Sequence, residues 1–424
     1  MPPIAMMIFT SIYGVVDGFF VSNFVGKTPF AALNLIWPLV MIMGSIGFMF
    51  GTGGSALVAK TMGEGDKTRA NNQFSLLVYV SVILSILIAT VAFIFMKPIA
   101  MMLGAQGELL KNCVLYGRIL CLAVPFYVLQ FEFQSFFVTA QKPKLGLYRT
   151  LVCGITNMIL DFLFIAVFEW ELAGAASATA ISQFIGGIFP IIYFSRRNTS
   201  LLRLTKTKFD SFVLSRTCTN GMSELLSNVS MSLVSMLYNA QLMKFVGENG
   251  VAAYGVLMYV NLIFLSVFIG YSIGTAPVIS YNFGAKNTQE LKNIRKKSIV
   301  IITLSSIFMC VLSLLLSNPL SKLFVGYDEA LFTLTQRGFF LFSFSFLFAG
   351  MCIFSSAFFT ALNNGLVSAL ISVLRTVVFQ VAFVLILPLV LNVDGIWCSL
   401  SFAELCSCVI AIILLILNKK KYSY

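Results

Sequence analysis

Six ionisable side chains lie inside long apolar stretches of this 424-residue chain, where a charge is costly to bury. Five are acids and one is a base: Asp17, Glu132, Asp161, Glu224, Arg375 and Glu404. Ionisable residues in such stretches bind ions or substrates or pair with one another, so each is a candidate functional residue. Which of them lie close together depends on the segments that carry them.

Apolar runs of about 20 residues recur along the whole chain, which is 59% hydrophobic and only 10% charged. A helix of that length crosses the roughly 30 Å hydrocarbon core of a bilayer. The pattern predicts an all-α integral membrane protein with twelve transmembrane helices, at residues 1–25, 31–57, 73–96, 114–139, 146–168, 174–194, 221–245, 251–277, 298–316, 338–361, 366–391 and 395–417. The longest polar stretch, about Ser195 to Thr219, is too short for a soluble catalytic or ATPase domain.

The formal net charge of +12 is spread unevenly over the predicted connectors. With the N-terminus inside, 20 of the 28 basic residues fall on the cytoplasmic side, including Arg149 in the connector that also holds Lys142 and Lys144. Seven fall on the opposite side, and Arg375 lies within a span. This positive-inside pattern predicts a multi-pass protein of the bacterial inner membrane with both termini in the cytoplasm. It also accounts for the charge without nucleic acid as a partner.

The chain repeats itself at a constant offset of 221 residues. The matching pairs are Val25-Gly26 and Val246-Gly247, Ala31-Ala32 and Ala252-Ala253, Gly53 and Gly274, Gly63 and Gly284, Phe137 and Phe358, Ala140 and Ala361, and Gly174 and Gly395. Because six is an even number of spans, both halves enter the bilayer from the same side and form a parallel repeat. We therefore predict an N-lobe at residues 1–205 with helices 1–6 and a C-lobe at residues 206–424 with helices 7–12, with the substrate path between them.

Four oxygen-bearing side chains of the N-lobe are predicted to share one depth in the membrane. Asp17 lies about 12 Å below the outer end of the first span, Asp161 about 10 Å below that of the fifth, and Thr179 about 8 Å into the sixth. Asn157 lies one turn from Asp161 on the same helix face. Two carboxylates with additional neutral oxygens suit a proton or a hard monovalent cation such as Na+.

The C-lobe has no equivalent of this cluster. The positions 221 residues later hold Tyr238, Val378, Ala382 and Leu400. A polar cluster with a purely architectural role would more often occur in both lobes. The alternative is that Asn157 and Asp161 only tie helices together.

The other four buried ionisable residues each allow two interpretations. Arg375 and Glu404 lie roughly 13–15 Å into neighbouring spans and can neutralise each other, either as a structural pair or as part of a transport path. Glu132 and Glu224 lie nearer the cytoplasmic side, where they can line an inward-open cavity; Glu224 can instead cap its helix. All four are candidates for lining or gating the cavity.

Residue types needed for other chemistry are absent or wrongly placed. The chain has no His, and its nine Cys lack metal-ligand spacing, so we predict that they are packing residues. Gly51-Thr52-Gly53-Gly54-Ser55 lacks the Lys and the spacing of a phosphate-binding loop. These features argue against a membrane-embedded enzyme and against an ATP-driven pump. We expect no cofactor, and H+ or Na+ as the coupling ion.

Four motifs resemble the multidrug and toxic compound extrusion (MATE) family, in particular its DinF-like bacterial branch. They are Tyr13-Gly14-Val15-Val16-Asp17, Met62-Gly63-Glu64-Gly65-Asp66, Asn157-Met158-Ile159-Leu160-Asp161 and Tyr281-Asn282-Phe283-Gly284-Ala285-Lys286. The resemblance covers essentially the whole chain. It implies a secondary antiporter that exports organic, often cationic, compounds in exchange for H+ or Na+.

In that branch, the N-lobe cation site is formed by an Asp on helix one with an Asn, an Asp and a Thr on helices five and six. The matching positions here are Asp17, Asn157, Asp161 and Thr179. Another branch uses carboxylates of helix ten, a mode disfavoured here because residues 338–361 contain no acid. One alternative from the same superfamily is a flippase for lipid-linked oligosaccharide precursors, which would be expected to have a strongly cationic cavity. We expect a small organic substrate and the lipid bilayer as partners, and a monomer.

Overall fold

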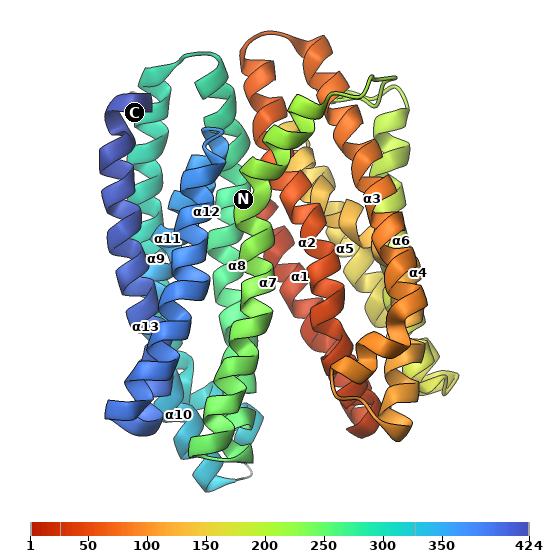
Figure 1. Cartoon of the computed structure of the whole chain (residues 1–424), viewed down its shortest axis with the longest axis vertical. Helices are drawn as coiled ribbons and strands as arrows, with labels where there is room; N and C mark the ends of the chain where they lie inside the picture. The colour runs from red at the N-terminus through yellow and green to blue at the C-terminus, as the bar shows by residue number, and fades with distance from the viewer. Residues whose placement is uncertain (1, 26, 327, 423–424) are drawn as a thin grey trace.

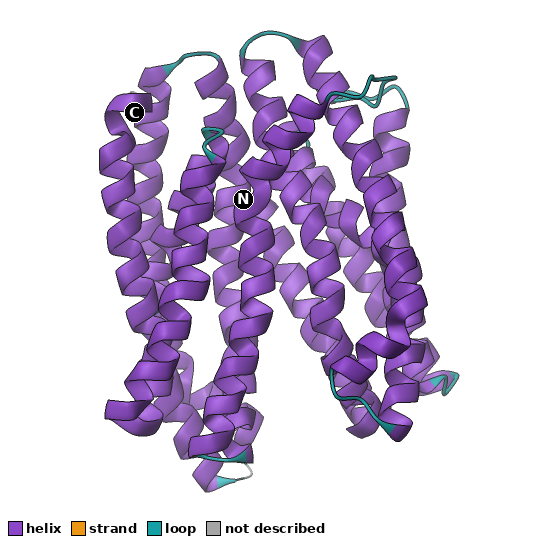
Figure 2. Cartoon of the chain, viewed as in Figure 1, coloured by secondary structure: helices purple, strands orange, loops and turns teal. Residues whose placement is uncertain are grey.

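The computed structural model describes residues 2–25, 27–326 and 328–422, and its described residues form helices and loops without any strand (Figures 1 and 2). Nine side chains within these ranges lie outside the description, at residues 15, 17–19, 22, 23, 27, 30 and 248. The predicted site residue Asp17 is one of them.

The first half of the chain forms six spans. Their helices are α1 (Pro2–Phe20) with its π-helical continuation η1 (Val21–Val25), α2 (Lys27–Gly63), α3 (Lys67–Met102), α4 (Gly107–Thr139), α5 (Pro143–Asp161) with its π-helical continuation η2 (Phe162–Val167), and α6 (Glu171–Ser195). Most of them extend beyond the predicted apolar runs, because polar residues such as the N-cap Asp66 start the helix outside the hydrocarbon core.

The second half also forms six spans, from helices α7 (Ser211–Phe245), α8 (Glu248–Gly284), α9 (Thr288–Val325), α10 (Glu329–Ser343), α11 (Phe346–Ala361), α12 (Gly365–Val373), η3 (Leu374–Phe379) and α13 (Gln380–Tyr422). Helices α10 and α11 make one span bent by 49°. The eleventh span runs through α12, η3 and the start of α13. It ends at Asn392, whose φ of 50° and ψ of −131° break α13, and the remainder of α13 is the twelfth span.

Length and apolar composition alone identify fewer spans than the fold contains. Eight helical segments of the described chain qualify, or nine when the bent pair α10–α11 is counted as one span. One of them, residues 365–422, holds both the eleventh and the twelfth span. Helix α7 does not qualify, because it carries many Ser, Thr and Asn residues along its length. The fold confirms the twelve spans that the apolar runs predict, six in each half of the chain.

The backbone confirms the internal repeat. Residues with left-handed φ values recur 221 or 222 positions apart, at Gly65 (92°) and Lys286 (55°), Gln141 (58°) and Asn363 (56°), and Glu171 (49°) and Asn392 (50°). Helix caps recur as well, since the side chains of Asp66 and Asn287 each accept a hydrogen bond from the backbone N–H three residues later. The same turns thus connect equivalent spans of the two halves.

Figure 1 shows α1–α6 on one side of the molecule and α7–α13 on the other, joined by residues 196–210 at one end. This connection is shorter than the predicted polar stretch, because α7 starts at Ser211 rather than at residue 221. The Asp210 carboxylate caps it by accepting hydrogen bonds from the N–H groups of Phe212 and Val213. The lobe boundary at residue 205 falls within this connection and stays a prediction.

The two lobes touch closely at the end that carries the α2–α3 and α8–α9 connectors, which the charge pattern predicts to be cytoplasmic. A Cβ atom at Gly63 of α2 would collide with the carbonyl oxygen of Tyr281 in α8. The repeat reproduces this contact, since a Cβ at Gly284 would collide with the carbonyl oxygen of Lys60. Absence of a side chain at these two glycines lets the helices cross in backbone contact. The lobes are therefore closed against each other at this end.

Candidate functional site: a cavity in the C-lobe and a buried polar cluster in the N-lobe

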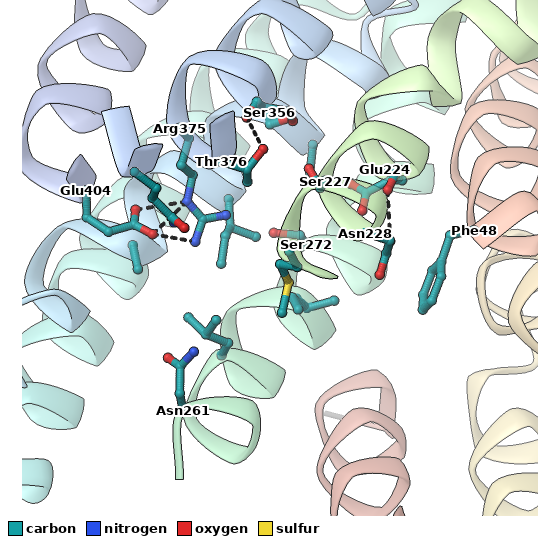
Figure 3. Close-up of a pocket in the computed structure, with 18 of the residues that line it drawn as sticks. Phe48, Glu224, Ser227, Asn228, Asn261, Ser272, Ser356, Arg375, Thr376 and Glu404 are labelled. Atoms are coloured by element: carbon teal, nitrogen blue, oxygen red, sulfur yellow. Dashed lines mark hydrogen bonds and ion pairs between the residues drawn. The ribbon is translucent and has the colours of Figure 1, made fainter. Parts of the chain in front are cut away.

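A cavity of about 160 Å³ lies mainly between helices of the C-lobe (Figure 3). Its walls come from α7, α8, α10, α11, α12, η3 and α13, and the N-lobe contributes Phe48, Thr52 and Ser55 of α2 and Ser135 of α4. Serine and asparagine side chains alternate with Met, Leu and Ile around it. A pocket with mostly apolar walls and a few polar groups suits an organic molecule.

An ion pair between Arg375 and Glu404 forms one wall of the cavity (Figure 3). The Arg375 Nε atom donates to both oxygens of Glu404, at 2.8 and 2.9 Å, and Nη2 lies 2.7 Å from Oε1. Arg375 is placed by η3 and Glu404 by the last span, so the pair links the eleventh and twelfth spans. The predicted neutralisation of these two residues is confirmed. Its geometry satisfies both charges within the protein.

Glu224 lies on α7 and faces the same cavity. Its backbone carbonyl accepts a hydrogen bond from Asn228, but its carboxylate forms no ion pair with any described residue. The alternative role as a helix cap is wrong, because α7 starts 13 residues earlier with Asp210 as its cap. The cavity thus contains a carboxylate whose charge is not balanced by a salt bridge.

The described members of the predicted N-lobe cluster are all buried. Asn157 and Asp161 lie one turn apart on α5, and Thr179 lies on α6. The Ser182 hydroxyl donates to the carbonyl of Cys153 at 2.9 Å, which fixes α6 against α5. Because these two helices are antiparallel, Thr179 is brought level with Asn157, one turn along each helix from that contact.

In this arrangement, some polar atoms of the cluster remain without a hydrogen-bond partner among the described residues. Among described residues, the Thr179 Oγ1 atom, which can serve as an oxygen ligand, and the Asn157 Nδ2 atom, which is an N–H donor, have no hydrogen-bond partner. Because the Asp17 side chain lies outside the described residues, the four-residue cation site remains a prediction. The chemistry of the donor set fits a proton or a small hard cation, which takes oxygen ligands.

Arg149 was missed by the sequence analysis, which counted it among the connector residues. It is only 4% exposed, and its guanidinium donates to the carbonyls of Gln130 in α4 (2.8 Å) and Gly186 in α6 (3.4 Å). The guanidinium also lies over the Phe137 ring, 5.9 Å from its centroid. Arg149 therefore ties α5 to both neighbouring helices. Arg149 lies four residues before Cys153, on the helix face that also carries Asp161. This spacing was the signal that could have revealed its burial.

Glu132 is fully buried on α4 and does not line the cavity. The Ser81 hydroxyl of α3 donates a short hydrogen bond to its Oε2 atom. Nearby on α4, the Gln130 amide donates to the Tyr13 hydroxyl of α1 at 3.2 Å. The role predicted for Glu132 in a cavity open to the cytoplasm stays a prediction, since the lobes are closed at that end.

Comparison with known proteins places the chain among transporters. The MatE family model matches it twice, over residues 2–163 and 225–386, in agreement with the repeat. The multidrug export protein MepA of Staphylococcus haemolyticus (strain JCSC1435) is 28% identical over 349 residues, which cover 80% of this chain and 76% of that protein. MepA of Staphylococcus saprophyticus subsp. saprophyticus (strain ATCC 15305 / DSM 20229 / NCIMB 8711 / NCTC 7292 / S-41) is 26% identical over the same shares.

Solved structures share the fold. A multidrug resistance MATE family transporter of the MOP superfamily in an outward-facing conformation superposes with a TM-score of 0.94 and 20% identity, covering 100% of this chain and 94% of that chain. A MOP superfamily transporter from Pyrococcus furiosus Vc1 (DSM3638) gives a TM-score of 0.93 at 20% identity, with 100% and 95% covered. At these identities the likeness concerns the fold alone.

Proposed function

Because this chain belongs to the MATE family of membrane transporters, we propose that it is a secondary active antiporter that exports organic cations in exchange for H+ or Na+. The observation that carries the proposal is the Glu224 carboxylate facing the cavity while Arg375, the cation beside it, is bound to Glu404. An unbalanced negative charge in a mostly apolar cavity favours a cationic ligand.

The cavity walls support an amphipathic substrate. Met231 and Met258 line it together with the stacked rings of Tyr238 and Tyr254, whose centroids are 5.2 Å apart. Flexible Met side chains adapt to differently shaped apolar groups, and aromatic faces attract cations. We propose that the cationic group binds near Glu224 and that the apolar part contacts these Met and Tyr residues.

Coupling is assigned to the N-lobe cluster of Asp17, Asn157, Asp161 and Thr179. Two carboxylates close together in an environment of low dielectric do not both ionise without a proton or a cation. Ion occupancy would then favour one arrangement of the N-lobe helices, and substrate in the cavity the other. The proposal includes orientation in the bacterial inner membrane with both termini in the cytoplasm, and a monomeric state.

The flippase alternative is not favoured by the cavity. A site for anionic lipid-linked precursors needs unpaired cationic groups, whereas Arg375 is held by Glu404 and Glu224 adds a negative charge.

Transport by purified protein in liposomes tests the proposal, with ethidium as the cationic probe and an imposed pH or Na+ gradient as the energy source. Asp161→Asn should abolish gradient-driven ethidium transport while ethidium binding persists. Asp394→Asn is the matched control, because that exposed acid pairs with Arg337 away from the cluster and the change should leave transport intact. Gradient-driven transport of normal rate in Asp161→Asn would refute the coupling site.

Substrate recognition is tested separately by ethidium binding without a gradient. Glu224→Gln should weaken ethidium binding about tenfold, equivalent to ~1.4 kcal/mol. Binding of an uncharged apolar dye should change little, because the apolar walls remain. Equal ethidium affinity in the variant and the native protein would exclude Glu224 as the counter-charge.

A further inference from the structure

A second cavity, of about 660 Å³, lies between the start of α3 and the connection 196–210. Both segments lie at the end of the molecule where the lobes meet (Figure 1). Three basic side chains line it: Arg69 from α3, and Lys206 and Lys208 from the connection. Its one acidic residue, Asp210, is already engaged as the cap of α7. The cavity therefore has an excess of positive charge.

Hydrogen bonds to α3 hold the connection that forms one wall of this basic cavity. The N–H of Thr205 donates to the Ser75 hydroxyl at 2.8 Å, and the Thr207 hydroxyl donates to the carbonyl of Asn72 at 3.0 Å. The N–H of Arg203 donates to the Asn71 side chain at 2.7 Å. The connection is thus held along α3, and Lys206 and Lys208 are placed beside the helix.

One residue that lines the basic cavity has an amide oxygen without a hydrogen-bond partner among the described residues. Gln73 of α3 is only 5% exposed, and its side-chain oxygen has no hydrogen-bond partner among the described residues. A buried polar group without a partner is costly, so a ligand or water in the cavity is expected to satisfy it. This observation is independent of the basic charges and points to an occupant.

The depth of the basic cavity matches the headgroup region of the bilayer. Helix α3 has 36 residues, about 54 Å at the α-helical rise, whereas the hydrocarbon core is about 30 Å thick. Its predicted apolar span starts at residue 73, so Arg69 lies just outside the core and Gln73 at its edge. Two exposed aromatic residues flank the cavity, Phe209 (76%) and Phe212 (58%), as expected where side chains meet lipid.

We propose that this basic cavity binds the phosphate-bearing headgroup of an anionic phospholipid. Arg69, Lys206 and Lys208 would bind the phosphate. The Gln73 amide oxygen would accept a hydrogen bond from a polar group of the headgroup. Inorganic phosphate shares this chemistry, but the exposed rings of Phe209 and Phe212 provide a surface for acyl chains that a free anion does not need.

A lipid in this position would bridge the two halves of the chain. Arg69 belongs to the N-lobe, whereas Lys208 lies directly before α7. Helix α7 in turn contacts α2 closely, because a Cβ at Gly221 would collide with the carbonyl of Met49. Bound lipid would therefore stabilise the arrangement in which the lobes are closed at this end.

Native mass spectrometry of the full chain in detergent tests the site, with added phosphatidylglycerol or phosphatidylcholine. The native protein should retain phosphatidylglycerol in preference. Lys206→Gln/Lys208→Gln should weaken this retention about thirtyfold, because each basic residue near a membrane surface contributes about 1 kcal/mol. Arg69→Gln, a single change on the other wall, should weaken it in the same direction.

Lys419→Gln/Lys420→Gln is the matched control, since it removes two exposed lysines from the same end of the molecule without touching the basic cavity. Retention of phosphatidylglycerol should be unchanged there. Equal retention in Lys206→Gln/Lys208→Gln and this control would overturn the proposal. Displacement of the lipid by millimolar inorganic phosphate would assign the site to a soluble anion and overturn the lipid assignment.

Discussion

In the C-lobe, the guanidinium of Arg375 is bound by the carboxylate of Glu404, so both charges are satisfied inside the protein. In the N-lobe, Arg149 is bound by the carbonyls of Gln130 and Gly186 instead, and Asp161 lies 12 residues further along the same helix. Arg149 therefore does not neutralise Asp161, from which it is separated by about 18 Å along α5.

This difference arises within one repeated backbone. The turns at Gln141 and Asn363 and the crossing at Gly63 and Gly284 are conserved between the halves of this chain. The side chains that face the lobe interiors are not, as at Tyr238, which stacks on Tyr254 where the N-lobe has Asp17. The repeat thus accounts for the shared backbone of the lobes, whereas the unrepeated side chains give each lobe a different interior. The proposed sites for substrate and coupling ion accordingly lie in different lobes.

The largest effect is expected from breaking the C-lobe pair. Glu404→Gln leaves the buried Arg375 charge without a carboxylate, which costs about 3–5 kcal/mol in comparable buried pairs. The double variant Arg375→Gln/Glu404→Gln should recover part of this loss, because no charge is stranded. Thermal unfolding in detergent measures both.

Glu224→Gln is the matched control for stability, since it makes the same change in the same cavity but removes no ion pair. Its thermal midpoint should stay close to that of the native protein. Equal midpoints for Glu404→Gln and Glu224→Gln would show that the pair does not stabilise the C-lobe.

The buried pair was predictable, because Arg375 lies roughly 13–15 Å into its predicted span and Glu404 lies at similar depth in the next span. Arg149 escaped prediction for a physical reason. It follows Lys142, Lys144 and the helix-starting Pro143, so it has the sequence context of a membrane-surface residue. Its burial depends on α4 and α6 presenting backbone carbonyls, which no side-chain pattern reveals.

The start of α7 and the partner of Glu132 were likewise not predictable from the sequence. Residues 211–220 are too polar to resemble a span, yet they are helical because Asp210 caps them. A Cβ at Gly53 of α2 would collide with the carbonyl of Thr217, so this polar stretch also packs against the other lobe. The Ser81 hydroxyl reaches Glu132 only through the rotation of α3 against α4, which the apolar pattern leaves undetermined. Helix number and repeat were therefore predictable, whereas contacts between helices were not.

An intermediate effect is expected at the repeated crossing. Gly63→Ala and Gly284→Ala each place a methyl group against a carbonyl oxygen of the opposite lobe. Overpacking of this kind costs typically about 1–3 kcal/mol, here only in the state closed at this end. Both variants should therefore shift the population toward the state open at this end, and to similar extents. Spin-label distances between the tips of α2 and α8 measure the shift.

Gly14→Ala is the control for this comparison, because no atom of the described residues would lie within 4 Å of its Cβ. It should leave the distance distribution unchanged. A shift in only one of Gly63→Ala and Gly284→Ala would show that the two crossings are not equivalent, and would limit the symmetry to the backbone.

The smallest effect is expected from a single neutral ligand of the N-lobe cluster. Thr179→Ala removes a buried hydroxyl that has no partner among the described residues, so the fold should lose little stability. Na+ needs several oxygen ligands, whereas a proton needs one carboxylate. The lost contact should be worth about as much as one hydrogen bond, or about 1 kcal/mol. This corresponds to roughly fivefold weaker Na+ binding, measured as the Na+ concentration that transport requires. Transport driven by a pH gradient should change much less.

Thr179→Ser distinguishes the oxygen ligand from the shape of the side chain. It keeps the hydroxyl and removes only the methyl group, so Na+-driven ethidium transport in liposomes should stay near the native rate. Equal loss in Thr179→Ser and Thr179→Ala would assign the effect to packing between α5 and α6. Equal loss with Na+ and pH gradients would remove Thr179 from the cation ligands and leave a cluster in which Asp17 and Asp161 exchange protons. After either outcome, the difference between the lobes would rest on their carboxylates alone. In the C-lobe, Glu404 is bound by an arginine. In the N-lobe, Asp17 and Asp161 would be neutralised by the proposed coupling ion.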